Sequence, residues 1–410
     1  MQGGFPNIRH LRVFLETAAT GSVSIAASRC NLSQPAATQA IAGLETDFAT
    51  PLLVRKRQQA TLTTCGALFA TRADKALKHL NEGAQAALRE GGERGRRTVT
   101  FEMAVTASQL RNLVAIARAG SFTAAARLLG LSQPTVHRTA RSLEAVAGVP
   151  LFSARASGIR LTPAAEAFLI GVKLAQAEIR QAIEEISREL GQEKGTFVVG
   201  SLPLARTTIV PKALHEMVNA VDGFQIRVVE GRYAELMRSL REGDLDCLIG
   251  ALRYPAPAED VTQECLFKDA LAIVAHPEHP LAQRRAIQIE ETLAYPWIAP
   301  PRETPAGQYL TQTLRISERP VNPVRMVSSS LAVLRAVLAE GPYLSVVSRH
   351  QIAVDQELGT ITALDVPLTG HLRDIGLTYR TGWEPTKTQT QFIDYLRHFS
   401  RLGRQTAPLA

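Results

Sequence analysis

The sequence lacks several features that define large classes of protein. No uninterrupted apolar run reaches about 18 residues, the length that a helix needs to cross a bilayer. The chain has four cysteines, none of them in a C-x-x-C pair. The opening residues MQGGFPNIRH contain no basic stretch followed by an apolar one, so we expect no signal peptide. These absences predict a cytoplasmic protein with reduced thiols and no membrane association.

Motifs that carry catalysis or hold metals are missing as well. We find no G-x-S-x-G, no P-loop and no acid–base pair in a supporting context. His276 and His279, in HPEHP, have no cysteine or carboxylate cluster at ligand spacing, which favours a surface turn over a metal site. Cys247 lies in the apolar run LDCLIGAL and is expected to be a buried, inert thiol. A redox pair with Cys265 is the alternative, although nothing in the spacing supports it. We therefore expect no enzyme activity, cofactor or metal.

Charge is unevenly distributed along the chain. Residues 1–193 hold 23 basic and 15 acidic residues, whereas residues 194–410 hold 23 of each. The net charge of +8 therefore belongs entirely to the first half. Basic charge gathered in one segment favours a polyanionic partner, because each Lys or Arg placed on a phosphate releases a counterion. A generic basic surface is the alternative.

A similar short sequence motif occurs twice in this basic half. Residues 21–35 read GSVSIAASRCNLSQP and residues 120–134 read GSFTAAARLLGLSQP, 99 positions apart. The match continues at the same offset, without a gap, through the LE, PL and LT pairs that follow. A match of this length indicates a duplicated domain. A length of 410 residues and 45% hydrophobic content predict about two to four domains with a large core.

Each copy is predicted to contain three helices and a hairpin. Gly21 and Gly120 end the first helix, and Ser33 and Ser132 cap the third, each followed by a proline in the first turn. Two short helices joined by a tight turn, with a polar second helix and a basic hairpin after it, are typical of a winged helix-turn-helix. A small docking module is the alternative reading.

Helical periodicity continues beyond each hairpin. TPAAEAFLIGVKLAQAEIRQAIEEISREL predicts a helix of about 29 residues, a length that usually mediates pairing. The first copy has a shorter predicted equivalent, ALFATRADKALKHLNEGAQAALRE, before the linker-like GGERGRR. From residue 196 onward, strand-length apolar runs alternate with helical segments. This alternation predicts an α/β region with a mostly parallel sheet, two lobes and a ligand cleft between them.

Residues 120–169 resemble the DNA-binding domain of the LysR-type transcriptional regulators. G-S, A-A, L-x-S-Q-P, L-E, G-V-P-L-F and L-T-P occur there in the family's order and spacing. GDLDCLIGAL, AHPEHPLA and EGPYLSVVSRH resemble landmarks of the family's effector-binding region. The resemblance implies a multidomain fold, with two α-rich winged helix-turn-helix domains and an α/β bilobal effector domain that resembles type 2 periplasmic binding proteins. The extra N-terminal copy departs from the family pattern.

By this resemblance, the third helix of each copy reads bases in the major groove. The second copy offers more groups for this, because Arg binds guanine and Gln reads adenine, whereas the first copy's helix has no basic residue. The basic hairpin of the first copy would bind phosphates, which adds affinity for DNA but does not distinguish one base sequence from another. The predicted DNA-binding residues are Ser132, Gln133, Pro134, Thr135, His137, Arg138, Arg141 and Arg155 in the second copy, and Ser33, Gln34, Thr38, Gln39, Arg55, Lys56 and Arg57 in the first.

The effector region offers hydroxyls and one cation at predicted strand ends. By resemblance, the candidate effector contacts are Ser201, Thr207, Arg253, Ser328 and Ser329. Arg253 would face a carboxylate, so an organic acid is the expected effector class. A helix N-cap is the alternative role of Ser328.

These observations predict a DNA-binding transcription factor of LysR type that responds to a small-molecule effector. The expected partners are double-stranded DNA, an effector and further copies of the chain in a dimer or tetramer, with RNA polymerase as a further candidate. The alternative is an enzyme or solute receptor of bilobal fold with non-specific nucleic-acid affinity. The predicted domains are residues 1–67, 106–165 and 194–403, with a helix and linker at 68–105 and a long dimerisation helix at 166–193.

Overall fold

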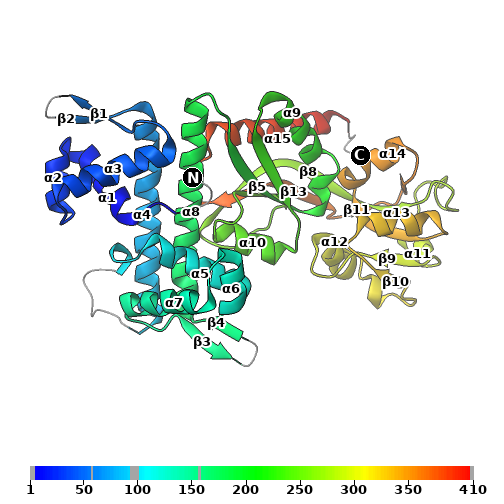
Figure 1. Ribbon diagram of the computed structural model, residues 1–410. Coiled ribbons are helices and arrows are strands. Elements are labelled where there is room, and N and C mark those ends of the chain that lie inside the picture. The colour runs from blue at the N-terminus through cyan, green and yellow to red at the C-terminus, as the bar shows by residue number, and fades with distance from the viewer. Residues whose placement is uncertain (1–4, 57–58, 93–100, 156–157, 407–410) are drawn as a thin grey trace. The chain divides into compact units, whose positions relative to one another are not determined.

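The computed structural model describes residues 5–56, 59–92, 101–155 and 158–406 (Figure 1). The chain divides into two units. One contains residues 1–196 with the short segments 223–225 and 241–244, and the other contains the remaining residues. Among the described helices, none is long and apolar enough to cross a membrane.

The first unit is built from one series of elements used twice. Three helices are followed by a two-stranded hairpin and a long helix, and each element of the second copy begins 99 positions after its counterpart. The first copy contains α1 (Ile8–Thr20), α2 (Val23–Arg29), α3 (Gln34–Phe48), β1 (Leu53–Lys56), β2 (Gln59–Leu62) and α4 (Thr64–Glu90). The second contains α5 (Ala107–Ala119), α6 (Phe122–Leu129), α7 (Gln133–Ala147), β3 (Phe152–Arg155), β4 (Gly158–Leu161) and α8 (Pro163–Glu189), preceded by the short helix η1 (Phe101–Met103).

The residues that the two copies share hold the local structure. The side chains of Ser33 and Ser132 accept backbone hydrogen bonds at the starts of α3 and α7. Gly21 and Gly120 end α1 and α5 with φ values of +66° and +68°, which a residue without Cβ adopts at little cost. Their carbonyls accept hydrogen bonds from the hairpins of 2.8 and 3.0 Å. The repeated motif therefore determines both the turn after the first helix and the position of the hairpin.

The repeated Leu-Glu pair has a structural role as well. Glu45 accepts hydrogen bonds from the backbone N–H groups of Leu52 and Leu53, at 2.9 and 3.1 Å. Glu144 does the same for the two equivalent residues of the second copy, at 2.8 and 3.0 Å. This carboxylate ties the third helix to the start of the hairpin. Both third helices continue three residues past it, to Phe48 and Ala147.

The long helices α4 and α8 pack against each other in the first unit, in antiparallel directions. Arg72 contacts Gln181, whereas Gly83, further along α4, meets Gly171, earlier in α8. A Cβ at Gly83 would lie 2.9 Å from the Cα of Gly171, so these glycines permit a close approach. The prediction of a shorter α4 was wrong, because both helices have 27 residues. Thr63 caps α4 at a start that the glycine in its first turn concealed.

The second unit contains a nine-stranded sheet in the order β10-β9-β11-β8-β13-β7-β5-β6, with β12 also on β8. Pairs β5–β7, β9–β10 and β9–β11 are parallel, and β8 and β13 run antiparallel to their neighbours. The prediction of a mostly parallel sheet was therefore wrong. The long strand β8 carries the chain from a first cluster of strands, β5, β6 and β7, to a second cluster, β9, β10 and β11, and β13 returns it. The two long strands therefore run in opposite directions. The strands are β5 (Gly195–Ser201), β6 (Phe224–Val229), β7 (Cys247–Ala251), β8 (Val261–Ala275), β9 (Trp297–Ala299), β10 (Val324–Val327), β11 (Leu344–Ser348), β12 (Thr362–Ala363) and β13 (Leu372–Arg380).

Helices cover this sheet, and separate apolar clusters lie beneath them. The last helix, α15, packs against α9 and β8. The helices are α9 (Ile209–Ala220), α10 (Tyr233–Arg241), α11 (Ile289–Thr292), α12 (Pro305–Gln308), α13 (Leu331–Ala339), α14 (Ala353–Glu357) and α15 (Lys387–Thr406), with short turns of helix at η2 (Pro203–Arg206), η3 (Tyr309–Thr313), η4 (Ile316–Glu318) and η5 (His350–Ile352).

Candidate nucleic-acid interface and effector site

Helix α7 separates a buried face from an exposed polar face. Val136, Ala140, Leu143 and Ala147 are buried and hold the helix on its domain. The opposite face exposes the predicted readers Ser132, Gln133, Pro134, Thr135, His137, Arg138 and Arg141. An exposed face with amide, imidazole and guanidinium groups has the donors and acceptors needed to recognise base edges.

Two of these side chains have partners that were not predicted. The His137 ring lies edge-on against Phe122, with 5.1 Å between ring centroids, so its orientation is set by α6. Arg141 forms an ion pair with Glu144, the carboxylate that holds the hairpin. The spacing of three residues along a helix is the signal for this pair. Arg138 remains the exposed guanidinium without such a partner among the contacts described.

Helix α3 presents a different face. Ser33, Gln34 and Gln39 are exposed, whereas Thr38 is half-buried. Its exposed side chains include no basic residue, and Asp47 lies exposed near its end. The helix therefore offers amides and few other groups that could recognise bases.

The hairpins place the predicted basic residues of the wings. In the first copy, Arg55 and Lys56 lie in β1, opposite Ala60 and Gln59 of β2. Arg57 lies outside the described residues. In the second copy, Arg155 ends β3, opposite Gly158 of β4. The hairpins thus occupy equivalent positions in both copies, next to the glycine turns.

The predicted effector residues lie at strand ends in the second unit. Ser201 ends β5 and is fully buried, with its hydroxyl 3.4 Å from the carbonyl of Leu202. Arg253 follows β7, and its guanidinium lies 3.5 Å above the ring centroid of Tyr233 in α10. Because β5 and β7 are parallel, both residues lie at the same edge of the sheet. Ligands of open α/β sheets bind at this kind of edge.

The other candidates lie at the carboxyl ends of the second strand cluster or face it. Ser328 and Ser329 follow β10, and the N–H of Ser328 donates to the carbonyl of Ala299 at the end of β9. Ser330, not Ser328, caps α13, so the alternative role considered for Ser328 was wrong by two residues. Thr207 follows η2 and donates to the carbonyl of His350, 3.5 Å away. That contact joins the two strand clusters, but no described contact joins Ser201 or Arg253 to Ser328.

A buried polar cluster at this junction was not predicted. Asp269, 3% exposed, pairs with Arg373 at 2.7 Å and accepts a hydrogen bond from the N–H of His350. The His350 ring contacts the hydroxyl of Thr208. Burial lowers the pKa of His350, and Lys212 acts in the same direction, whereas Asp269 opposes the shift. An acid directly before the apolar run ALAIVA of β8 was the signal available in the sequence.

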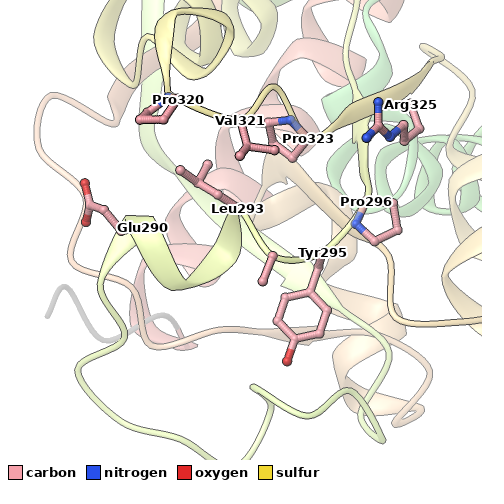
Figure 2. A pocket seen from close by; sticks show the side chains of 9 residues that line it. Glu290, Leu293, Tyr295, Pro296, Pro320, Val321, Pro323 and Arg325 are labelled. Atoms are coloured by element: carbon pink, nitrogen blue, oxygen red, sulfur yellow. The ribbon is translucent and has the colours of Figure 1, made fainter.

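A surface pocket of about 520 Å³ lies elsewhere on the second unit (Figure 2). It lies between the end of α11 and the strands β9 and β10, and none of the predicted effector residues lines it. Its lining contains two charged side chains and is otherwise formed by uncharged residues, four of them Tyr295 and three prolines. The lining residues are Glu290, Leu293, Ala294, Tyr295, Pro296, Pro320, Val321, Pro323 and Arg325.

The histidine and cysteine side chains form no metal site in the described part of the chain, where no group of three or more potential ligands occurs. His279 is 4% exposed and packs on Tyr295, with ring centroids 4.4 Å apart. The backbone N–H of Leu281 donates to His279, as expected for a turn. Cys247 is fully buried, which raises the pKa of its thiol, whereas Cys265 is exposed.

Known proteins resemble both units. A family model described as "Bacterial regulatory helix-turn-helix protein, lysR family" matches residues 8–67 and again residues 107–166. A model described as "LysR substrate binding domain" matches residues 190–401, more than half of the chain. Among solved structures, a full-length OxyR variant from Pseudomonas aeruginosa is 24% identical with a TM-score of 0.50, and covers 71% of this chain and 97% of its own. LysG from Corynebacterium glutamicum with bound effector Arg is 19% identical with a TM-score of 0.51, and covers 72% and 98%. These two similarities concern the fold.

Two curated relatives differ in how much of the chain they match. The HTH-type transcriptional regulator GalR of Pseudomonas putida is 32% identical over 379 residues, which are 92% of this chain and 93% of that protein. The regulator PcaQ of Agrobacterium fabrum is 31% identical over 288 residues, 70% of this chain and 93% of its own. The match with GalR is therefore long enough to include both winged copies. The chain belongs to the LysR family of transcriptional regulators, which bind DNA and respond to a small-molecule effector.

Proposed function

We propose that α7 is the main sequence-reading helix of this regulator and that the first copy mainly adds affinity. One observation carries the proposal: α7 exposes Gln133, Thr135, His137 and Arg138, whereas the exposed face of α3 has no basic group. Arginine bound to guanine through two hydrogen bonds supplies about 1–3 kcal/mol of discrimination. The basic hairpin of the first copy, with Arg55, Lys56 and Arg57, contacts phosphate, which adds affinity on any sequence.

We propose further that the effector is a small organic acid bound at the strand ends of the second unit. Ser201, Thr207, Ser328 and Ser329 supply hydroxyls or nearby backbone N–H groups, and Arg253 supplies the cation. Binding at these ends changes the relation of the two strand clusters, and through it the affinity for operator or for RNA polymerase. The contact of Thr207 with His350 joins the two strand clusters, so a change in their relative position would alter it.

Selection of duplexes from a random pool by the full chain tests the first proposal. The selected site then serves as the probe in binding titrations at several salt concentrations. Arg138→Ala is expected to reduce the ratio of specific to non-specific affinity by about tenfold or more. The Arg55/Lys56/Arg57 triple alanine variant is expected to weaken both affinities alike and to flatten the salt dependence. Arg118→Ala, an exposed residue of α5, is the matched control. Equal loss of specificity in both test variants would refute the division of roles.

A panel of organic acids, scored by thermal shift of the full chain, tests the second proposal. Arg253→Ala and Ser329→Ala are expected to abolish the shift given by an active acid. Ser330→Ala is the control, because it removes a helix cap and lowers stability without removing a proposed ligand contact. A shift that survives both test variants would place the effector elsewhere.

A further inference from the structure

The pairing of α4 with α8 takes place inside one chain. The two helices belong to the two copies and lie side by side (Figure 1). The apolar core of the unit runs without a break through both copies and both long helices. Two winged domains are thus already joined through paired helices before any second chain is added.

The pairing is not symmetric, although the copies are equivalent. In an antiparallel pair of identical helices, each contact would recur at the positions related by the 99-residue offset. The contact of Gly83 with Gly171 would recur between positions 72 and 182, where this chain has Arg72 and Ala182. One end of the pair is therefore a close approach of glycines, and the other end contains a buried guanidinium.

At the other end, Arg72 of α4 forms a buried polar cluster with Glu178, Gln181 and Glu185 of α8. We call this cluster the lock. Arg72 is 3% exposed and donates two hydrogen bonds to Glu185, at 2.6 and 3.1 Å. It also donates to Glu178 at 3.0 Å and to Gln181 at 2.9 Å. A buried cation is tolerated where carboxylates surround it, and buried carboxylates likewise require the cation. The lock therefore specifies which helix pairs with which.

Pairing between like helices of two chains would break this lock. In an α8–α8 pair with the same register, Glu178, Gln181 and Glu185 would face Gly171 of the other helix, because Gly171 occupies the position equivalent to Arg72. Buried carboxylates would then have no cation. An α4–α4 pair would set Arg72 against His79, Glu82 and Ala86, a single carboxylate in place of two.

The connection between the copies favours closure within the chain. The end of α4 reaches the second copy, because a Cβ at Gly91 would lie 2.5 Å from the side chain of Val149. On the far side of the connection, Glu102 accepts a hydrogen bond from Asn81 of α4 at 3.1 Å. One end of the connection thus continues from α4 and contacts the second copy, and the other end is held on α4. Covalent connection over a short segment gives an effective concentration on the order of millimolar.

We propose that a single chain forms a complete two-headed DNA-binding unit, closed by the α4–α8 pair, and that it recognises an operator with two unlike half-sites. The proposal rests on the assignment of α7 and α3 as reading helices. Two-fold symmetric proteins bind palindromes, since site symmetry mirrors protein symmetry. Here the scaffold is two-fold only approximately and its reading faces differ, so the operator has a direction.

Charge exchange across the lock tests closure in the full-length chain. Arg72→Glu in one variant, and the pair Glu178→Arg with Glu185→Arg in another, are each expected to weaken binding to the selected duplex by about tenfold or more. The triple variant with all three changes is expected to recover to within about threefold of the parent. Co-expression of the two defective variants is expected to give no recovery, because neither chain can complete its own lock. Lys78→Glu, an exposed residue of α4, is the matched control.

Two outcomes of this experiment would overturn the proposal. Recovery on co-expression would mean that α4 of one chain pairs with α8 of another. Unchanged binding by both defective variants would mean that the lock does not specify the pairing. Native mass spectrometry of the variants reports chain association without reference to DNA, so it still tests closure if α7 proves not to be the reader.

Rearranged operators test whether the operator has two unlike half-sites. Scrambling either half of the selected duplex is expected to weaken binding, and by unequal factors. A palindrome built from the half-site of α3 is expected to bind about tenfold more weakly than the native arrangement, because it lacks the base pairs that α7 reads and each mismatched pair costs affinity. A palindrome built from the half-site of α7 is expected to lose only the smaller contribution of α3. Tighter binding of this second palindrome than of the native site would show that two α7 helices from different chains act together.

Discussion

The two winged copies use the same elements at the same spacing, yet they differ at positions that bear on stability and on recognition. Each begins its reading helix with a serine cap and ties its hairpin down with the same glutamate. The differences lie in the first helix, on the exposed face and at the end of the third helix, at the start of the long helix, and where the long helices meet. The shared residues thus maintain the domain, whereas the changed residues distinguish the two copies.

Removal of Arg72 is expected to have the largest effect on this comparison. Arg72→Ala leaves Glu178 and Glu185 without their cation, and breaking a buried ion pair from one side costs about 3–5 kcal/mol. Hydrogen exchange of the full chain, followed by mass spectrometry, is expected to show lost protection in both α4 and α8. Lys78→Ala on the exposed side of α4 should leave protection unchanged. Protection kept in the Arg72 variant would contradict the assignment of the lock.

The partner of α8 could not be predicted from the sequence. The length of α8 predicted that it pairs with another helix, but length alone does not identify the partner. The specific contact depends on a guanidinium from residue 72 reaching carboxylates more than 100 positions away. Such a match becomes visible only when the antiparallel register is known. The equal length of α4 was missed for a local reason, a glycine in the first turn.

Gly66 and Ala165 give the next comparison, since they occupy equivalent positions. A Cβ at Gly66 would lie 1.9 Å from the carbonyl oxygen of Leu52, so α4 begins too close to its hairpin for any side chain. Gly66→Ala is expected to destabilise the first copy by about 1–3 kcal/mol through overpacking. Ala165→Gly opens space in the second copy and is expected to cost about 1 kcal/mol, mainly through helix propensity. Denaturant unfolding of the full chains, resolved by hydrogen exchange of each copy, gives both values. Equal costs would mean that both helix starts have the same clearance.

The candidate sites were predictable to unequal degrees. The candidate readers on α7 were predicted from the family resemblance, and they lie on the exposed face of the helix, opposite its buried apolar residues. The effector region was harder. Asp269, Arg373 and His350 come from three distant segments, so no local pattern joins them. Ser328 and Ser330 could not be told apart by sequence, because either serine can cap a helix that begins nearby.

A buried amide distinguishes the first helices of the two copies. Asn112 of α5 donates to the carbonyl of Val136 in α7 at 2.7 Å, and its equivalent in the first copy is the buried Val13. Val13→Asn is expected to cost about 1–3 kcal/mol, because it buries an amide where the chain has an apolar contact. Asn112→Val loses one hydrogen bond and removes a buried oxygen that has no partner among the described groups, so it should cost at most about 1 kcal/mol. Thermal unfolding of both variants measures the difference. A larger loss for Asn112→Val would show that the amide fixes the place of α7.

The ends of the reading helices provide the finest comparison. Gly148 ends α7 with a φ of +73°, whereas Ala49 ends α3 with a φ of +52°, a conformation that L-residues with a Cβ adopt at a cost. Ala49→Gly is expected to raise stability by up to about 1 kcal/mol, and Gly148→Ala to lower it by a similar amount. The opposite signs make the pair informative, because a general effect of glycine on the unfolded chain would favour alanine at both positions. Matched denaturant titrations would reveal the signs. A loss of stability in Ala49→Gly would mean that contacts of the alanine methyl outweigh the strain at its backbone.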